Sequence, residues 1–307
     1  MLISIICPVY NEEESIEIFV NAISTIFLKI EENFEIIFIN DGSTDNSLYI
    51  LLELRKKYKN IKIIEFSRNF GKEFALTAGL DYTQGDAIIP IDVDLQDPPE
   101  LIVDFIKHWK GGSEVVLAKR VNRQEDDIFK RITSTLFYKL HNKISDVKIP
   151  ENVGDYRLMS KKVVEKIKLL PENQRFMKGI FAWVGFSATY VEYTRTKRIA
   201  GTSKFNGWKL WNFALDGITS FSTFPLKVWT YIGFTTSFLS FLYGSFIILN
   251  SLIFGIDTPG YASLIVVILF MGGLQLIGIG VLGEYLGRIF METKKRPSYI
   301  IKETYGI

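Results

Sequence analysis

The sequence of 307 residues predicts an α/β fold that is followed by a pair of transmembrane helices. Short apolar runs alternate with amphipathic stretches as far as about residue 193, and several runs end in polar or acidic residues. Two long stretches without charge lie nearer the C-terminal end. The alternation is typical of a mainly parallel, Rossmann-like sheet with helices on both faces. The length accommodates one large α/β domain with a smaller attachment.

Five apolar runs are the expected strands, at residues 2–9, 35–40, 61–66, 86–92 and 114–119. Between the first two, apolar residues recur at helical spacing from Ile16 to Ile30, which predicts a helix. The first run has no basic segment before it and ends at Asn11, so it is expected to be a strand and not a signal peptide. Its Cys7 is expected to pack in the core. A single cysteine agrees with a reducing compartment.

Polar motifs follow four of these runs. They are Pro8-Val9-Tyr10-Asn11-Glu12, Asp41-Gly42-Ser43, Asp92-Val93-Asp94-Leu95-Gln96-Asp97 and Lys119-Arg120. Active sites in parallel sheets lie beyond the carboxyl ends of the strands, so the four motifs are expected to share one edge. A plain turn is the alternative interpretation of Asp41-Gly42.

The acidic motif after the fourth run predicts a metal site. Side chains alternate along a strand, so Asp92, Asp94 and Gln96 are expected to converge on one side and to offer oxygen ligands to Mg²⁺ or Mn²⁺ on a diphosphate. The alternative is that the acidic residues only cap a helix. Asp97-Pro98-Pro99-Glu100 matches a helix start with Asp97 at the N-cap, so Asp97 is assigned to structure and the other three to the site.

Two stretches, 228–254 and 262–283, contain no charged residue, and each exceeds the roughly 20 residues that cross a bilayer. They are expected to be transmembrane helices, because core helices rarely reach this length without a charge. The connecting residues 255–260 contain no Lys or Arg. Basic residues flank the pair: Lys209, Lys227, Arg288, Lys294, Lys295 and Arg296. The positive-inside rule therefore places both termini in the cytoplasm.

The expected domains are a catalytic unit at 1–197, a loop and juxtamembrane segment at 198–227, two spans at 228–290 and a cytoplasmic tail at 291–307. Aromatic residues in the second unit predict an amphipathic segment that lies in the membrane surface, with a soluble helical hairpin as the alternative. Glycines of the second span, including Gly283 and Gly287, permit close helix pairing within or between subunits. A homo-oligomer is therefore expected.

The ordered motifs, together with 198–204 and the two spans, resemble family 2 glycosyltransferases of the GT-A fold. The resemblance covers essentially the whole chain and is to the polyprenyl-phosphate glycosyltransferases, in particular the phage-type bactoprenol glucosyltransferases of O-antigen modification. It implies inverting transfer of glucose from UDP-glucose to undecaprenyl phosphate at the cytoplasmic face of the bacterial inner membrane. A mannose synthase-like transfer, or another nucleotide sugar with the same lipid, is the alternative.

The resemblance also implies roles for particular residues. Nucleoside contacts fall to Pro8, Tyr10, Glu12 and Asp41, with Asp92 beside the nucleotide. The metal ligands would be Asp94 and Gln96, with Asp92 direct or through water. Arg198, Ser203 and Lys204 match a loop that closes over the diphosphate, although a basic cluster attracted to anionic lipid is the alternative. Asp155 matches a proposed catalytic base, and Arg157, with Arg120 or Arg123, could hold the acceptor phosphate.

The chemistry of the acceptor qualifies the role of Asp155. A phosphate monoester has a second pKa of about 6 and is largely ionised at neutral pH. Asp155 is therefore predicted to orient the acceptor or a cationic partner as much as to remove a proton. The net charge of +2 indicates no nucleic-acid partner. A processive synthase would carry a Gln-x-x-Arg-Trp motif and more spans, and two spans are few for a flippase, so the transferase is favoured.

Overall fold

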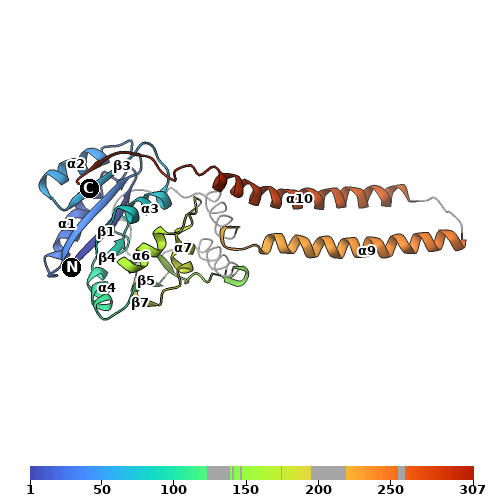
Figure 1. Ribbon diagram of the computed structural model, residues 1–307, viewed down its shortest axis with the longest axis horizontal. Helices are drawn as coiled ribbons and strands as arrows, with labels where there is room; N and C mark the ends of the chain where they lie inside the picture. Colours follow the sequence, from blue (N-terminus) through green and yellow to red (C-terminus); the bar gives the residue numbers. More distant parts are fainter. Residues whose placement is uncertain (123–138, 140–141, 146, 174, 195–218, 255–259) are drawn as a thin grey trace.

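A computed structural model describes residues 1–122, 139, 142–145, 147–173, 175–194, 219–254 and 260–307. Figure 1 shows a layered domain that contains both chain ends, from which two long helices project. The projecting helices are α9 (Phe224–Phe254) and α10 (Tyr261–Thr293). The α/β domain and the helical pair therefore form distinct parts of the molecule, as the charge pattern predicts.

The described strands form one eight-stranded sheet in the order β7-β5-β6-β4-β1-β2-β3-β8. Their bounds are β1 (Leu2–Val9), β2 (Asn33–Asn40), β3 (Ile61–Phe66), β4 (Ala87–Pro90), β5 (Val115–Asn122), β6 (Val153–Ser160), β7 (Ala188–Thr194) and β8 (Ile301–Tyr305). Strands β4, β1, β2 and β3 are parallel, and β6 runs antiparallel to both β4 and β5. Strand β5 therefore has the direction of β1. The carboxyl ends of β1, β2, β4 and β5 share one edge, as expected.

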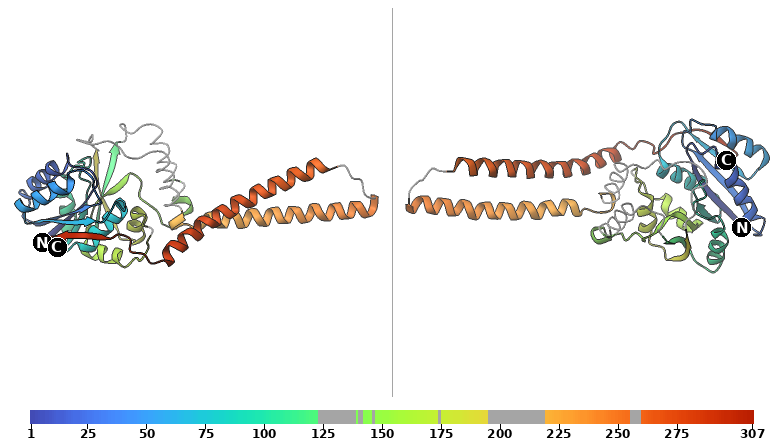
Figure 2. Two further views of the ribbon diagram at one scale, coloured as in Figure 1. Left: turned by 90° about the horizontal axis from the view of Figure 1, so that it is seen from above. Right: turned by 180° about the vertical axis from the view of Figure 1, so that it is seen from behind.

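Helices cover both faces of the sheet, which Figure 2 shows edge-on. On one face, Ile3, Ile5 and Cys7 pack with α1 (Ile16–Phe27), α2 (Ser47–Lys57) and α4 (Leu101–Lys110). The other face packs against α3 (Lys72–Tyr82), α6 (Lys161–Lys168) and α7 (Met177–Trp183). Cys7 is fully buried, so the prediction of a core cysteine is confirmed.

Three strands were not expected from the sequence, and each lacks a simple apolar pattern. Strand β6 carries Asp155 and Arg157, because its first residues serve the functional edge. Strand β7 is partly exposed along its length, so it lacks the continuous apolar run of a central strand. Strand β8 is a short, charged edge strand, a composition that discourages pairing between molecules.

The chain returns to the sheet after the second long helix, where a tail was expected. Strand β8 pairs antiparallel with β3, and the Lys302 ammonium lies 2.6 Å from a Glu65 carboxylate oxygen. The Tyr299 ring stacks on Phe66 with centroids 5.1 Å apart, and its hydroxyl donates to Asp81 at 2.7 Å. Residues 299–305 are therefore a structural part of the α/β domain.

Both projecting helices are long and apolar enough to cross a membrane. Their mean hydropathies are 1.8 and 2.5, and their apolar side chains are largely exposed. At the base of the pair, the Tyr285 hydroxyl donates to the Ser222 carbonyl at 2.7 Å, which ties α10 to the segment before α9. The expected amphipathic segment, up to residue 218, lies outside the described residues.

The glycines of α10 divide into two kinds. A Cβ on Gly278 would lie 3.4 Å from the Trp229 ring of α9, whereas one on Gly283 or Gly287 would meet no atom within 4 Å. Within the described residues, the Gly283-x-x-x-Gly287 pair therefore does not serve the contact between α9 and α10. The expected homo-oligomer stays a prediction.

Candidate active site

The loops after β1 and β2 interlock through hydrogen bonds to backbone amides. The Asn11 amide donates to Ser43 Oγ at 3.0 Å, and the Asn11 side-chain carbonyl accepts from the Thr44 amide at 2.8 Å. Asn11 has a φ of 55°, a left-handed conformation that asparagine tolerates. Pro8, Tyr10 and Glu12, which were assigned to the nucleoside, lie at least partly exposed beside this joint. The two loops therefore form one fixed wall of the edge.

Asp41 fixes a third loop against this wall. Its two carboxylate oxygens accept hydrogen bonds from the Phe70 and Gly71 amides at 2.6 and 2.9 Å. Burial raises the pKa of the Asp41 carboxyl, and the two amide donors oppose that rise. A Cβ on Gly42 would lie 2.5 Å from the Arg68 backbone, which explains a glycine here. The carboxylate of Asp41 thus anchors residues 67–71, which lead directly into α3.

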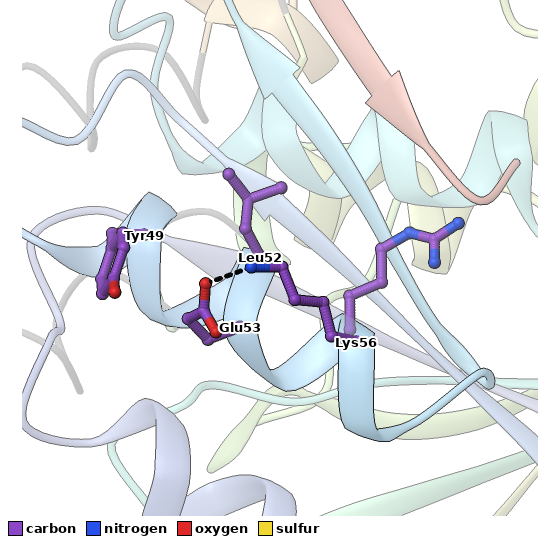
Figure 3. A pocket seen from close by; sticks show the side chains of 5 residues that line it. Tyr49, Leu52, Glu53 and Lys56 are labelled. Carbon is purple, nitrogen blue, oxygen red and sulfur yellow. Dashed lines mark hydrogen bonds and ion pairs between the residues drawn. The ribbon is translucent and has the colours of Figure 1, made fainter.

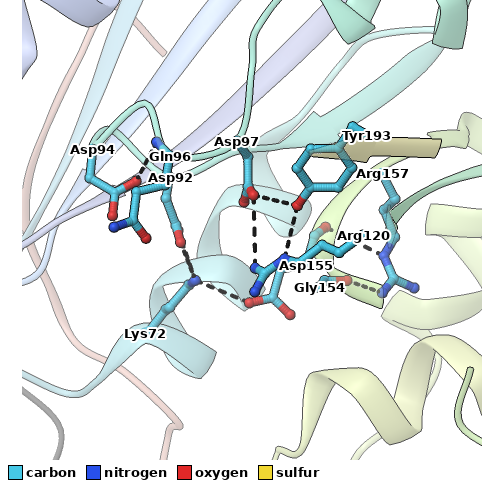
Figure 4. A network of polar contacts seen from close by, with 10 residues as sticks. All are labelled: Lys72, Asp92, Asp94, Gln96, Asp97, Arg120, Gly154, Asp155, Arg157 and Tyr193. Carbon is cyan, nitrogen blue, oxygen red and sulfur yellow. Dashed lines mark hydrogen bonds and ion pairs between the residues drawn. The ribbon is translucent and has the colours of Figure 1, made fainter. Parts of the chain in front are cut away.

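The acidic motif is a tight turn and not the end of a strand. Strand β4 ends at Pro90, Leu95 has a φ of 54°, and Asp94 Oδ1 accepts the Gln96 amide at 3.1 Å. Asp92, Asp94 and Gln96 do lie together, as Figure 4 shows. The three side chains therefore converge as predicted. The turn brings them together, so strand alternation, the reason given for the prediction, is wrong.

Asp97 is not the cap of α4, which is a correction to the sequence analysis. Helix α4 begins at Leu101 with Glu100 at the N-cap position. Asp97 is buried and instead accepts a hydrogen bond from the Tyr193 hydroxyl at 2.5 Å, and the Arg120 guanidinium lies 3.8 Å from the same carboxylate oxygen. Arg120 also donates to the Tyr193 hydroxyl at 3.0 Å. This network joins the acidic turn to β5 and β7 (Figure 4).

Lys72 joins the carboxylates of Asp92 and Asp155. Its ammonium nitrogen lies 2.7 Å from Asp92 Oδ1 and 3.0 Å from Asp155 Oδ2. Burial alone would lower the pKa of the Lys72 ammonium, but the charges of Asp92 and Asp155 outweigh burial and raise it. Lys72 therefore carries its charge throughout the physiological range.

Asp155 is enclosed by positive charge. Burial alone would raise the pKa of its carboxyl, but Lys72, with Lys178 and Arg157 nearby, holds that pKa below its usual range. Its Oδ1 atom is buried and accepts no hydrogen bond within the described residues. Among the described residues, Asp155 is therefore an ionised carboxylate with one oxygen held by Lys72 and one buried oxygen that has no donor.

Glu73 is a second acidic residue whose charge interacts with that of Asp155. Its carboxylate accepts the Met177 amide at 2.8 Å and so ties α3 to α7. Burial, and then the negative charge of Asp155, raise the pKa of the Glu73 carboxyl to about 7. A pKa in this range is unusual for a glutamate and marks the site as one where charges are crowded.

The arginines assigned to the acceptor phosphate differ in their surroundings. Arg157 is buried, donates to the Gly154 carbonyl at 2.6 Å and lies over the Phe181 ring at 4.2 Å. Arg120 belongs to the Asp97 network described above. Both come from strands β5 and β6 next to Asp155. The other predicted residues of the phosphate set, Arg123, Arg198, Ser203 and Lys204, lie outside the described residues.

The residues at the turn suit a sparsely held divalent cation. No cluster of three or more His, Cys, Asp or Glu side chains capable of metal binding occurs among the described residues. Mg²⁺ typically takes one or two carboxylates and completes its shell with water and substrate phosphates. Asp94, with Gln96 beside it, fits such a set. Asp92 is in contact with Lys72 and has less freedom to serve as a direct ligand.

Two cavities differ in their relation to this site. The hollow in Figure 3 has a volume of about 440 Å³, and all five of its lining residues belong to α2, so it is a surface feature of one helix. A second cavity, of about 200 Å³, is lined in part by Arg157, two residues from Asp155 on β6, and has three cationic side chains in a mainly apolar wall. The residues that characterise it are Lys148, Arg157, Lys178, Phe181, Phe186 and Tyr190.

Sequence reasoning missed Lys72, Glu73 and Tyr193. The first two are the opening residues of helix α3. Their position directly after the loop Ser67–Gly71 was a usable signal, because that loop follows the carboxyl end of β3 and so lies at the functional edge. Tyr193 gave no local signal, since its contact with Asp97 spans 96 residues.

Comparison with known proteins agrees with this geometry. The family model described as glycosyl transferase family 2 matches residues 4–168. The bactoprenol glucosyl transferase of Shigella phage SfX is 59% identical over 302 residues, which cover 98% of this chain and 99% of that protein. A prophage bactoprenol glucosyl transferase homolog of Escherichia coli K12 is 58% identical, with the same coverage of 98% and 99%. An uncharacterized glycosyltransferase of Synechocystis is 52% identical, covering 99% and 96%.

Among solved structures, mannosyl-3-phosphoglycerate synthase from Rubrobacter xylanophilus aligns at 13% identity, with a TM-score of 0.49 and coverage of 70% of this chain and 71% of that one. The mixed sheet covered by helices on both faces is a GT-A-like arrangement, which agrees with the expected fold. With a matching family model over more than half of its length and full-length relatives well above 50% identity, the chain belongs to glycosyl transferase family 2.

Proposed function

We propose that this glycosyltransferase transfers glucose from UDP-glucose to undecaprenyl phosphate, with inversion, and yields undecaprenyl-phosphate glucose. The observation that carries the proposal is the full-length identity to bactoprenol glucosyl transferases. The edge of the sheet supplies the parts that such a reaction needs. A wall formed by the β1 and β2 loops and by Asp41 suits a nucleoside, and the acidic turn suits a diphosphate with its metal ion.

The acceptor class is supported by two features. Helices α9 and α10 are long and apolar enough to anchor the enzyme in the membrane that holds a polyprenyl lipid. The 200 Å³ cavity lined in part by Arg157 combines cationic side chains with an apolar wall, a chemistry that suits a phosphate on a hydrocarbon chain. We infer a cytoplasmic catalytic domain at the bacterial inner membrane, because nucleotide sugars are cytoplasmic donors.

Metal dependence is part of the proposal. Asp94 and Gln96 would hold Mg²⁺ or Mn²⁺ together with the donor diphosphate. A bound divalent cation would neutralise the charge that develops on the departing UDP. The chain itself would orient the acceptor with Asp155, Arg157 and Lys178. Because the acceptor phosphate is already ionised near neutral pH, Asp155 has little need to act as a base.

The test is incubation of membranes that contain the protein with a panel of labelled nucleotide sugars and undecaprenyl phosphate. We expect labelled lipid from UDP-glucose, its loss with a chelator and its return with added Mg²⁺ or Mn²⁺. Asp94→Asn should lower the rate about a hundredfold, because even the loss of a residue that only supports a metal ligand costs roughly 10–100-fold. Asp104→Asn, an exposed residue of α4, is the matched control and should retain the full rate. Labelling from GDP-mannose alone would contradict the sugar assignment.

A further inference from the structure

Three separate segments of the chain meet at the ammonium group of Lys72. Lys72 is the first residue of α3, Asp92 belongs to the turn after β4, and Asp155 lies on β6. The ammonium donates to Asp92 Oδ2 at 2.8 Å and lies 3.0 Å from Asp155 Oδ2 (Figure 4). The ammonium thus links the carboxylate beside the metal turn to the carboxylate assigned to the acceptor.

The backbone that carries Lys72 is held on both sides. Ahead of it, the Asp41 carboxylate binds the Phe70 and Gly71 amides, so the loop that enters α3 is fixed to the nucleoside wall. Behind it, Glu73 accepts the Met177 amide and ties the first turn of α3 to α7. The backbone at Lys72 is therefore held in place on both sides, unlike the backbone of a lysine on a mobile surface loop.

The two carboxylates differ in how many of their oxygens contact Lys72. Asp155 gives one oxygen to Lys72, and its buried Oδ1 has no donor within the described residues. Asp92 contacts Lys72 through both of its oxygens, at 2.7 and 2.8 Å. Asp94 Oδ1 accepts the Gln96 amide of the same turn at 3.1 Å, and under the proposed function Asp94 is the metal ligand.

We propose that Lys72 is a positioning residue of the transfer site, which holds the Asp92 and Asp155 carboxylates in a fixed relation to each other. This inference rests on the proposed function, because it assigns Asp92 to the donor side and Asp155 to the acceptor side. In this arrangement Asp92 acts mainly through Lys72, while Asp94 serves the metal. Lys72 also supplies the positive charge that allows two carboxylates to lie close together.

The test is a double-mutant cycle of Lys72→Met and Asp155→Asn in the full-length protein in detergent. We expect Lys72→Met to lower kcat about fiftyfold or more while KM for the nucleotide sugar changes less than about threefold, because the loss falls on orientation in the transition state. If Lys72 acts through Asp155, the double variant should be no more than about threefold slower than the slower single variant. Lys161→Met, which removes the exposed lysine that opens α6, is the matched control and should retain wild-type kinetics.

A merely structural role gives a different pattern. Removal of Lys72 would then lower the melting temperature, and its kinetic loss would multiply with that of Asp155→Asn. Either multiplicative losses or a kcat for Lys72→Met within threefold of the wild type would overturn the inference. Lys72→Gln, which still donates a hydrogen bond, provides a second variant if Lys72→Met melts well below the wild type, and the same two outcomes decide it.

The cycle is measured with whichever nucleotide sugar and polyprenyl phosphate the wild-type protein uses. Failure of UDP-glucose as the donor would therefore overturn the proposed function without deciding the role of Lys72. Failure of the cycle with an active wild type would overturn the role of Lys72 and leave the proposed function intact.

Discussion

At the scale of single residues, the candidate site is a set of carboxylates that differ in what holds them. Asp41 is held by backbone amides, Asp97 by a tyrosine hydroxyl, and Asp155 by an ammonium group. Each partner leaves a different chemistry available, because an amide-bound carboxylate supports a loop whereas one with a free oxygen can meet a substrate. The same residue type therefore meets three different kinds of partner within one edge of the sheet.

The first prediction concerns Asp41. Asp41→Asn replaces one acceptor with a donor that faces an amide, so the loop 67–71 should loosen. We expect faster hydrogen exchange at the Phe70 and Gly71 amides in the ligand-free protein, and affinity for UDP about tenfold or more below wild type. Exchange measured by mass spectrometry and UDP binding by calorimetry check this. Unchanged exchange with weakened binding would instead indicate that Asp41 acts only by direct contact with the nucleoside.

The second prediction concerns Glu73 and pH. The pKa of Glu73 rises from 4.5 to about 7 on folding, so the folded protein binds this proton more tightly than the unfolded chain does. The stabilisation is fully present below pH 4.5 and is lost as pH rises through about 7, with a slope of at most about 1.4 kcal/mol per pH unit. The low pKa of Asp155 acts in the opposite sense but below pH 4.

Glu73→Gln should remove this dependence while it keeps an acceptor for the Met177 amide. We expect the melting temperature of the wild type to fall by a few degrees relative to the variant between pH 5 and 7.5. Differential scanning fluorimetry in detergent measures the difference, and Glu165→Gln, an exposed residue of α6, is the control. Parallel curves for the wild type and Glu73→Gln across this range would contradict the raised pKa.

Residue-level sequence reasoning found the acidic motif and its neighbours because they follow apolar runs. It could not assign Lys72, whose two partners lie 20 and 83 positions along the chain, because nothing local encodes that meeting. It assigned Asp97 wrongly, because Asp-Pro-Pro-Glu satisfies a helix-start pattern whether or not the helix begins there. The preference of Asp97 for Tyr193 depends on β7, a strand the sequence did not predict.

At the scale of elements, α3 is the part that most constrains the site, because it begins at Lys72 and packs on the central strands. Its Gly79 lies so close to β1 that a Cβ there would be 2.2 Å from Ile6 Cγ2 and 3.0 Å from Ile39 Cδ1. Glycine inside a helix ordinarily costs about 1 kcal/mol relative to alanine. Close packing on the sheet is the physical reason for glycine here.

The third prediction follows from this contact. Gly79→Ala should destabilise the protein by about 1–3 kcal/mol, the usual effect of overpacking a buried site, in spite of the gain in helix propensity. It should also lower activity, since a displaced α3 moves Lys72. Gly280→Ala in α10 is the control, because a Cβ there meets no atom within 4 Å. Thermal unfolding and initial rates are the measurements, and equal stability for the two variants would show that α3 has room to move.

Elements with one clear period were predictable, and those shaped by distant partners were not. Strand β1 and strand β3 match their apolar runs closely, whereas α9 begins four residues before its run and α10 extends ten residues beyond its run. Strand β4 is shorter than expected, because the chain turns at the acidic motif. Strand β8 is a strand because it pairs with the edge of β3. Its charged sequence does not show this pairing, so from the sequence alone it was expected to be a tail.

At the scale of the whole molecule, the sheet fixes the relation between the two ends of the helical pair. Strand β3 precedes α9, strand β8 follows α10, and the two strands are hydrogen-bonded neighbours. The chain therefore leaves the α/β domain, runs out along α9, returns along α10 and rejoins the same domain (Figures 1 and 2). If the pair crosses a bilayer, both ends of the chain lie on one side of it. From the distribution of Lys and Arg, we predict that this side is the cytoplasm.

The last prediction tests this topology with single cysteines. Cys7 is fully buried, so the unaltered chain should give little labelling with a maleimide in its native state, in intact or opened cells. Asp257→Cys, in the segment between the spans, should react with a membrane-impermeant maleimide from outside once the outer membrane is permeabilised. Thr304→Cys, on the exposed side of β8, should react only after the inner membrane is opened. Labelling of both positions only after that opening would mean that the pair enters the membrane without crossing it. Labelling of Thr304→Cys from outside would reverse the orientation and separate the catalytic edge from cytoplasmic nucleotide sugars.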